Sequence, residues 1–88
     1  MTLTNEEIAR RLRTHANELA RTGGNLYRVR AFRSAAMAVL GLCAEVTELV
    51  ASGGTRELEH VPGIGKSLAH TIASYVTALT LAERRVAV

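Results

Sequence analysis

The sequence contains no aspartate and no tryptophan, and it has a single cysteine, Cys43. One cysteine cannot form an internal disulfide, and alone it cannot hold a zinc ion. Because its neighbours are apolar, we expect Cys43 to be a small buried filler of the core. No apolar run reaches the roughly 20 residues that span a membrane, and no signal-peptide pattern opens the chain. We therefore expect a soluble cytoplasmic protein, associated with the nucleoid if it is bacterial, that does not engage a membrane.

Aromatic residues are also scarce, because Tyr27, Phe32 and Tyr75 are the only ones among the 88 residues. This length is enough for a single modest hydrophobic core. A core of leucine, valine, isoleucine and alanine, with few strand-like segments, predicts an all-α fold. We expect one compact domain of four to five helices over residues 1–88, monomeric in solution.

Caps and helical spacing predict where these helices begin and end. Thr4 and Glu7 form a capping box before the first helix, which Gly23 and Gly24 end, and Asn25 caps the second helix. The second helix is expected to run to about Leu40, with Val29, Phe32, Ala36, Val39 and Leu40 facing inward. The remaining predicted segments are a helix over about 44–51, a short helix over 56–60 capped by Thr55, and a last helix from Lys66 to Leu79 or beyond, with a frayed tail over 82–88.

The positive charge is unevenly distributed along the chain. Arginine supplies ten of the eleven basic residues, and it binds phosphate bidentately better than lysine does. Residues 25–42 carry Arg28, Arg30 and Arg33 with no acid, whereas residues 43–60 carry Arg56 against four glutamates. This distribution favours one basic face, and an ordinary solvated surface is the alternative. Arg33 flanks the apolar stripe, so we expect it to be half buried, where it suits a backbone carbonyl or a glutamate as well as DNA.

Residues 58–76 contain the most distinctive pattern, because the turn Pro62-Gly63-Ile64-Gly65 joins two helical segments. Proline cannot continue the first helix, and the two glycines permit backbone angles and close approaches that a side chain would prevent. Ile64 is expected to turn inward and fix the turn to the core. The N–H groups that open the second helix form an anion site, and the first side chains beyond the turn are Lys66 and Ser67.

Three catalytic alternatives conflict with the residues present. The Gly-Lys-Ser sequence ends a P-loop pattern, but His60 stands where that pattern requires its first glycine, and there is no aspartate to hold Mg²⁺. A Ser-His-Asp triad lacks its aspartate for the same reason, although a glutamate could substitute in principle. His15, His60 and His70 have no metal-ligand spacing with one another or with Cys43. The sequence therefore argues against an NTPase, a hydrolase and a metalloenzyme.

The segment LEHVPGIGKSLAHTI resembles the helix-hairpin-helix motif of DNA-binding and repair proteins. Together with the preceding NLYRVRAFRSAAMAVLGL, it resembles the small N-terminal, lyase-type domain of the family X DNA polymerases, of the DNA polymerase beta kind. The resemblance covers about Glu6 to Leu79. The polymerase palm itself has no counterpart in the sequence.

This resemblance implies binding to the backbone of single-stranded, gapped or duplex DNA in repair or replication. Such contacts position a protein without reading bases, and they weaken with salt. The resemblance implies main-chain carbonyls of Glu59, Val61 and Ile64 that can hold K⁺ or Na⁺, with no other cofactor required, and a repair or replication protein as a partner. The expected DNA-binding residues are Gly63, Ile64, Gly65, Lys66 and Ser67 of the hairpin, with Arg28, Arg30 and Arg33.

Some members of this family also excise a 5′-deoxyribose phosphate through a lysine Schiff base. That lysine falls at Thr71 here, a neighbouring family lysine falls at Ser67, and a family histidine falls near Tyr27. Because threonine has no amine, Lys66 is the only side chain that could form the imine. We therefore expect DNA binding without catalysis, with an abasic-site or deoxyribose-phosphate lyase through Lys66 as the first alternative. A protein-docking module is the second.

Overall fold

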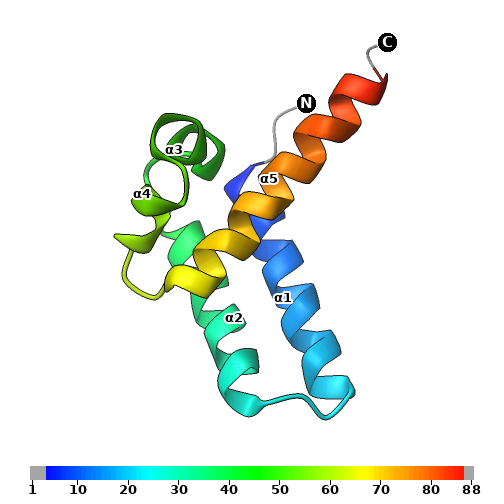
Figure 1. The fold of residues 1–88 in the computed structure, drawn as a ribbon. Coiled ribbons are helices and arrows are strands. Elements are labelled where there is room, and N and C mark those ends of the chain that lie inside the picture. The colour runs from blue at the N-terminus through cyan, green and yellow to red at the C-terminus, as the bar shows by residue number, and fades with distance from the viewer. Residues whose placement is uncertain (1–3, 87–88) are drawn as a thin grey trace.

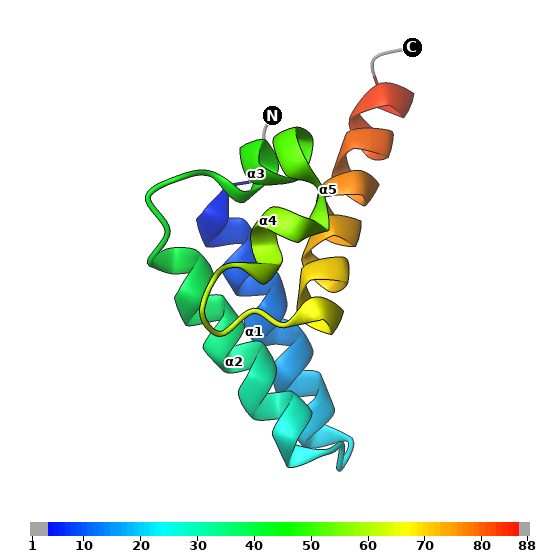
Figure 2. The ribbon, with the colours of Figure 1, turned by 60° about the vertical axis from the view of Figure 1, so that its left-hand side comes forward.

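The computed structural model of the chain describes residues 4–86, with side chains described for residues 4–78. Its helices are α1 (Asn5–Arg21), α2 (Leu26–Leu40), α3 (Val46–Gly53), α4 (Thr55–Glu59) and α5 (Lys66–Val86). The described residues contain no strand, so the all-α prediction is confirmed. Helices α1 and α2 form an antiparallel pair, and α5 crosses this pair and extends beyond it (Figure 1). Helices α3 and α4 lie at the end of the pair where α1 begins and α2 ends (Figure 2).

Local sequence signals define both ends of α1 and the start of α2. The Thr4 hydroxyl accepts a hydrogen bond from the Glu7 N–H at 3.2 Å, and the Asn25 side chain accepts one from the Tyr27 N–H at 2.7 Å. At the end of α1, the Gly24 N–H donates to the Leu19 carbonyl at 2.7 Å. This is the long-range bond of a Schellman motif. The predicted caps Thr4 and Asn25 are therefore confirmed.

The hydrophobic core draws residues from all five helices and from the turn before α5. Its buried members are Ile8, Ala9, Leu12, Ala16, Val29, Phe32, Ala35, Ala36, Val39, Val46, Leu58, Ile64, Leu68, Ala69 and Ile72. Small alanines at several of these positions let the helices approach closely. Within the described residues, no polar or charged residue is classed as buried.

Asn5, at the start of α1, holds the connection before α3. Its side-chain amide donates to the Ala44 carbonyl at 2.8 Å, and its side-chain oxygen accepts from the Val46 N–H at 2.8 Å. The Asn5 backbone N–H also donates to a Glu45 carboxylate oxygen at 3.2 Å. Glu45 precedes α3 without making a side-chain cap, so Asn5 satisfies the first N–H of α3 from a distant part of the chain.

Two side chains expected inside the core are exposed. Cys43, in the connection between α2 and α3, is exposed, and Leu40, at the end of α2, is 46% exposed. Helical spacing placed Leu40 on the apolar stripe, but burial also requires a partner that covers that turn of the helix. The predictions that Cys43 and Leu40 are buried are wrong for this reason.

The boundaries differ from the predictions in the second half of the chain. Thr55 is the first residue of α4, and Gly54 takes the capping position without a side-chain hydrogen bond, so the predicted Thr55 cap is wrong. Helix α3 begins at Val46 and ends at Gly53, two residues later than expected at each end. Helix α5 continues to Val86, through residues expected to fray, while residues 87 and 88 lie outside the described part.

The molecule measures 41 × 27 × 18 Å along its principal axes. The long dimension reflects the far end of α5, which projects past the other helices (Figure 1). Among the described residues, none of the helices combines the length and the apolar composition needed to cross a bilayer.

Candidate nucleic-acid interface

The hairpin turn between α4 and α5 is held on two sides. The Ile64 N–H donates to the Val61 carbonyl at 3.0 Å, and the Ile64 side chain is 3% exposed. Burying an isoleucine side chain contributes about 1.5–3 kcal/mol, so Ile64 fixes the turn to the core as predicted. Gly63 has φ +91°, and a Cβ built on it would lie 3.6 Å from the Ala38 Cβ of α2. The turn therefore rests against α2 with a backbone that favours glycine.

Helix α5 begins without a capping side chain. The Gly65 carbonyl accepts the Ala69 N–H at 2.9 Å, which places Gly65 at the start of the helix. Helices α1 and α2 are capped by Thr4 and Asn25, whose side chains accept a hydrogen bond from an N–H of the first turn, but glycine has no such group. The first N–H groups of α5 therefore have no intrahelical partner and carry the positive end of the helix dipole.

A hollow of about 360 Å³ separates the start of α5 from the first turns of α2. We call it the hairpin hollow. It contains two basic side chains, Arg28 and Lys66, which lie 38 positions apart in sequence. Its lining residues are Tyr27, Arg28, Ala31, Phe32, Gly65, Lys66, Ser67 and Leu68. No acidic residue is among them, so the hollow is electropositive and adjoins the uncapped start of α5.

Arg28 is held beside an aromatic stack. Its guanidinium carbon lies 5.9 Å from the centre of the Phe32 ring, within the range of a cation–π contact. The Phe32 ring stacks on the His15 ring of α1, with centroids 4.5 Å apart and planes 7° from parallel. Phe32 itself is buried. The stacked rings of Phe32 and His15 therefore lie on one side of Arg28, whose side chain is exposed to solvent.

Gly65 leaves room in the hairpin hollow. A Cβ built at this position would meet nothing within 4 Å, and the residue does not have a positive φ. Neither the packing nor the backbone angle of Gly65 requires glycine. A side chain at position 65 would instead occupy space beside the exposed N–H groups of α5.

The predicted DNA-binding residues fall into two groups. Arg28, Gly65, Lys66 and Ser67 line the hairpin hollow, and Gly63 and Ile64 form the turn beside it. Arg30 is exposed and does not line the hollow. Arg33 is exposed and donates to the Asn17 side-chain oxygen of α1 at 3.4 Å. The prediction of a half-buried Arg33 is therefore wrong.

Sequence reasoning placed Phe32 in the core and Tyr27 on the outer face of its helix. The structure adds that both border the hairpin hollow, and Tyr27 is 84% exposed there. The spacing of Arg28 and Phe32, four residues apart on one helix, is the signal that could have joined them. Arg28 and Phe32 lie near Lys66 only because of how α5 packs against α2, and no local sequence pattern predicts that packing.

Thr71 lies one helical turn beyond Ser67, and its hydroxyl donates to the Ser67 carbonyl at 3.1 Å. Thr71 is the position where the polymerase domain that the sequence resembles would carry a lysine. Its hydroxyl is hydrogen-bonded within α5. Among the described residues, no cluster of three or more His, Cys, Asp or Glu residues could hold a metal.

Comparison with known proteins gives one match. A family model described as helix-hairpin-helix domain matches residues 3–81, nearly the whole chain. No curated protein and no solved structure matches it significantly.

Proposed function

Because the chain belongs to the helix-hairpin-helix domain family, we propose that it binds DNA through backbone phosphates, without sequence preference. Domains of this family generally bind nucleic acid nonspecifically. The observation that carries the proposal is the hairpin hollow, where Arg28 and Lys66 converge beside the uncapped start of α5. A guanidinium, an ammonium and free helix N–H groups are three kinds of donor that phosphate accepts together.

The distribution of acids supports the same site. Glu45, Glu48, Glu57 and Glu59 are exposed on α4 and around α3, and none of them lines the hairpin hollow. A polyanion would therefore meet its strongest attraction at the hollow and repulsion along α3 and α4. Tyr27 offers an exposed ring at the rim for a sugar or an unpaired base.

The first test measures DNA affinity by fluorescence anisotropy. Labelled single-stranded, gapped and duplex DNA are titrated with the protein across a salt series, and affinity is expected to fall steeply as salt rises. Arg28→Ala is expected to weaken binding by about tenfold, or about 1.4 kcal/mol. Arg30→Ala, on the same helix but outside the hollow, is the matched control with a smaller effect. Flat anisotropy for all three DNAs at low salt would refute the proposal.

We also propose that the turn holds a monovalent cation. The carbonyls of Glu59, Val61 and Ile64 would hold K⁺ or Na⁺, since rings of carbonyl oxygens replace the hydration shell of such ions. The Val61 oxygen accepts the Ile64 N–H and keeps a second lone pair for an ion. The ion would add positive charge beside the phosphate. Replacing K⁺ with choline at constant ionic strength is expected to weaken DNA binding, and unchanged affinity would remove the ion from the proposal.

We place this binding in DNA repair or replication and without catalysis. The support is the resemblance to the family X domain, combined with a threonine at the Schiff-base position. Borohydride reduction with an abasic substrate distinguishes the lyase alternative, because only an amine forms a trappable imine. No adduct is expected. An adduct that disappears in Lys66→Ala would establish the lyase instead.

The protein-docking alternative has one supporting feature. Leu26, Met37 and Leu40 of α2 are large apolar residues with 68%, 75% and 46% of their surfaces exposed. None of the three lines the hairpin hollow. Nothing in the structure shows what would cover them, so DNA binding is the function proposed.

A further inference from the structure

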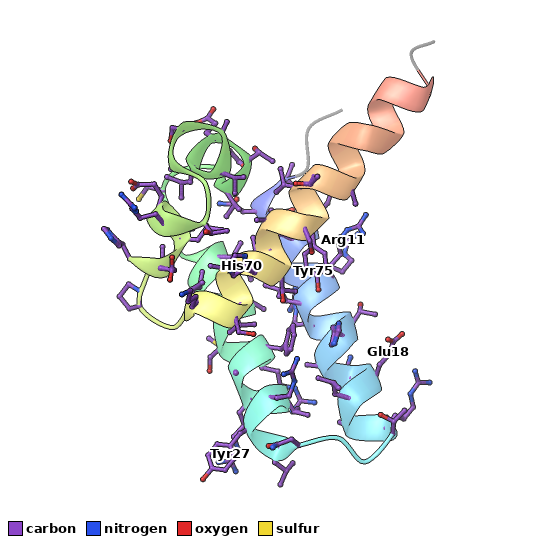
Figure 3. The ribbon with its side chains drawn as sticks, viewed as in Figure 1. Arg11, Glu18, Tyr27, His70 and Tyr75 are labelled. Atoms are coloured by element: carbon purple, nitrogen blue, oxygen red, sulfur yellow. The ribbon has the colours of Figure 1, made fainter. Side chains whose placement is uncertain are left out.

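A second hollow lies between α1 and α5, and its volume of about 580 Å³ exceeds that of the hairpin hollow. We call it the α1–α5 groove. Six residues of α1 line one wall and Tyr75 of α5 forms the other: Glu7, Arg10, Arg11, Thr14, His15, Glu18 and Tyr75. Figure 3 shows Arg11 and Tyr75 side by side, with Glu18 further along α1.

The aromatic stack joins the groove to the hairpin hollow. Phe32 lines the hollow, His15 lines the groove, and their rings lie parallel with centroids 4.5 Å apart. Arg28 stands 5.9 Å from the same Phe32 ring on the hollow side. On the groove side, Arg11 lies one helical turn from His15, on the same face of α1. Arg28, Phe32, His15 and Arg11 are therefore successive neighbours that link the hairpin hollow to the groove.

The charges of the groove are arranged with cations in the middle and acids at the ends. Arg10 and Arg11 lie about one turn from Glu7, and Glu18 closes the groove beyond His15. Arg10 and Arg11 are exposed, so their guanidinium groups are accessible to an anion. Glu7 and Glu18 would repel a phosphate placed beside them, so the attraction for phosphate is confined to the middle of the groove.

Tyr75 supplies an aromatic wall. Its side chain is half buried and packs against the core. Burial raises the pKa of the Tyr75 hydroxyl, and the nearby Arg11 guanidinium acts in the opposite direction. The phenol is therefore neutral at physiological pH and can donate to a base or a phosphate. His15 is partly exposed in the groove, so two rings border the same space.

We infer that the α1–α5 groove is a second DNA subsite, which takes the nucleotide adjacent to the one held at the hairpin hollow. Its base lies against His15 and Tyr75, and its phosphate contacts Arg11. The inference rests on the proposed DNA binding and adds a second contact on a different helix. Stacking of this kind requires an unpaired base, so the groove acts on single-stranded or gapped DNA and not on intact duplex.

The test compares two lengths of labelled oligothymidine, about 1 and about 12 nucleotides, of which only the longer one, within the range of single-strand site sizes, can occupy the hairpin hollow and the groove together. Arg11→Ala is expected to weaken binding of the longer oligonucleotide by about tenfold and to leave the intact duplex unchanged. Arg13→Ala is the matched control, since Arg13 is exposed on the same helix and lines neither the groove nor the hairpin hollow. Equal effects of the two variants on the longer strand would overturn the inference.

A second measurement isolates the base. All bases of the longer oligonucleotide are replaced with abasic analogues, so that no change of register supplies a base, and the loss is expected to weaken binding to the native protein about tenfold. His15→Ala should reduce that difference, because only the Tyr75 ring then remains for the base. An undiminished difference in His15→Ala would place the base elsewhere and overturn the assignment.

The two proposals fail separately. If neither oligonucleotide nor duplex binds the native protein, the proposed function is wrong. If Lys66→Ala weakens all DNAs while Arg11→Ala behaves like Arg13→Ala, the hairpin hollow stands and the groove is not a subsite. Circular dichroism of each variant confirms that the helices remain intact.

Discussion

At the scale of single residues, the two glycines of the hairpin have different reasons to be glycine. Gly63 adopts φ +91°, where a side chain strains the backbone. Gly65 has an ordinary φ and open space around a built Cβ, yet it lines the hairpin hollow. The first glycine is therefore required by folding. The second is required, on our proposal, by the phosphate.

This difference gives a paired prediction. Gly63→Ala is expected to lower the free energy of unfolding by about 1–2 kcal/mol, the cost of a left-handed residue with a Cβ. Gly65→Ala is expected to leave it unchanged or raise it by up to about 1 kcal/mol. Gly65→Ala should nevertheless weaken DNA binding about tenfold, or about 1.4 kcal/mol. Urea denaturation and anisotropy measure the two quantities, and undiminished DNA affinity in Gly65→Ala would separate this glycine from the site.

Tyr75 makes stability depend on alkaline pH. Its pKa in the folded protein is raised above 10.0, the ordinary value of a tyrosine, because burial disfavours the phenolate. A raised folded pKa stabilises the native state fully below the unfolded pKa, and this contribution is lost as pH rises through the folded pKa. Urea midpoints should therefore fall less between neutral and strongly alkaline pH in Tyr75→Phe than in the native protein. Identical pH profiles would contradict this, and Tyr27→Phe, at an exposed position, is the control.

Individual residues also show what periodicity cannot predict. Ile64 was predictable, because an apolar residue between two glycines of a turn has few places to go except inward. Cys43 has apolar neighbours in the sequence, and Leu40 lies on the apolar stripe of its helix, yet both are exposed. Whether a side chain is covered depends on where other helices lie, which a single segment does not specify.

At the scale of elements, the helix starts divide into local and distant types. Thr4 and Asn25 cap their own helices from within three residues, so sequence sufficed to predict them. The first N–H of α3 is satisfied by Asn5, which lies 41 positions away. No capping pattern near Val46 could have revealed this, and the predicted start of α3 was accordingly displaced.

Asn5→Ala is therefore expected to lower the free energy of unfolding more than most substitutions at the end of a helix. It removes two side-chain hydrogen bonds and leaves the part-buried Val46 N–H without its partner, at an expected cost of about 1–3 kcal/mol. Asn17→Ala is a matched control in the same helix, because its contact with Arg33 is exposed and 3.4 Å long; about 0.5 kcal/mol or less is expected. Chemical denaturation of both variants is the measurement, and equal losses would show that the Asn5 clamp contributes little.

At the scale of the whole molecule, the first turns of α2 lie next to the start of α5, and this arrangement creates the hairpin hollow. Arg28 and Lys66 belong to segments with separate periodicities, and nothing in either segment specifies their approach. The resemblance of the combined segments to a DNA polymerase domain suggested both as DNA contacts. The packing of α5 across the α1–α2 pair then separated Arg28, at the hairpin hollow, from Arg30 and Arg33, which lie outside it. Three arginines that are close in sequence thus have different surroundings.

The salt dependence of DNA affinity tests whether local cations or the total charge of the molecule control binding. The net charge is only +3, so binding should depend on local cations more than on overall attraction. For single-stranded DNA the slope of log affinity against log salt changes by about 0.7 for each phosphate contact. Lys66→Ala should flatten the slope by about that amount. Arg56→Ala makes the same change in net charge on exposed α4, among glutamates and outside both hollows, and should leave the slope unchanged. If the two variants flatten the slope equally, DNA responds to the total charge of the domain, and the hairpin hollow holds no phosphate of its own.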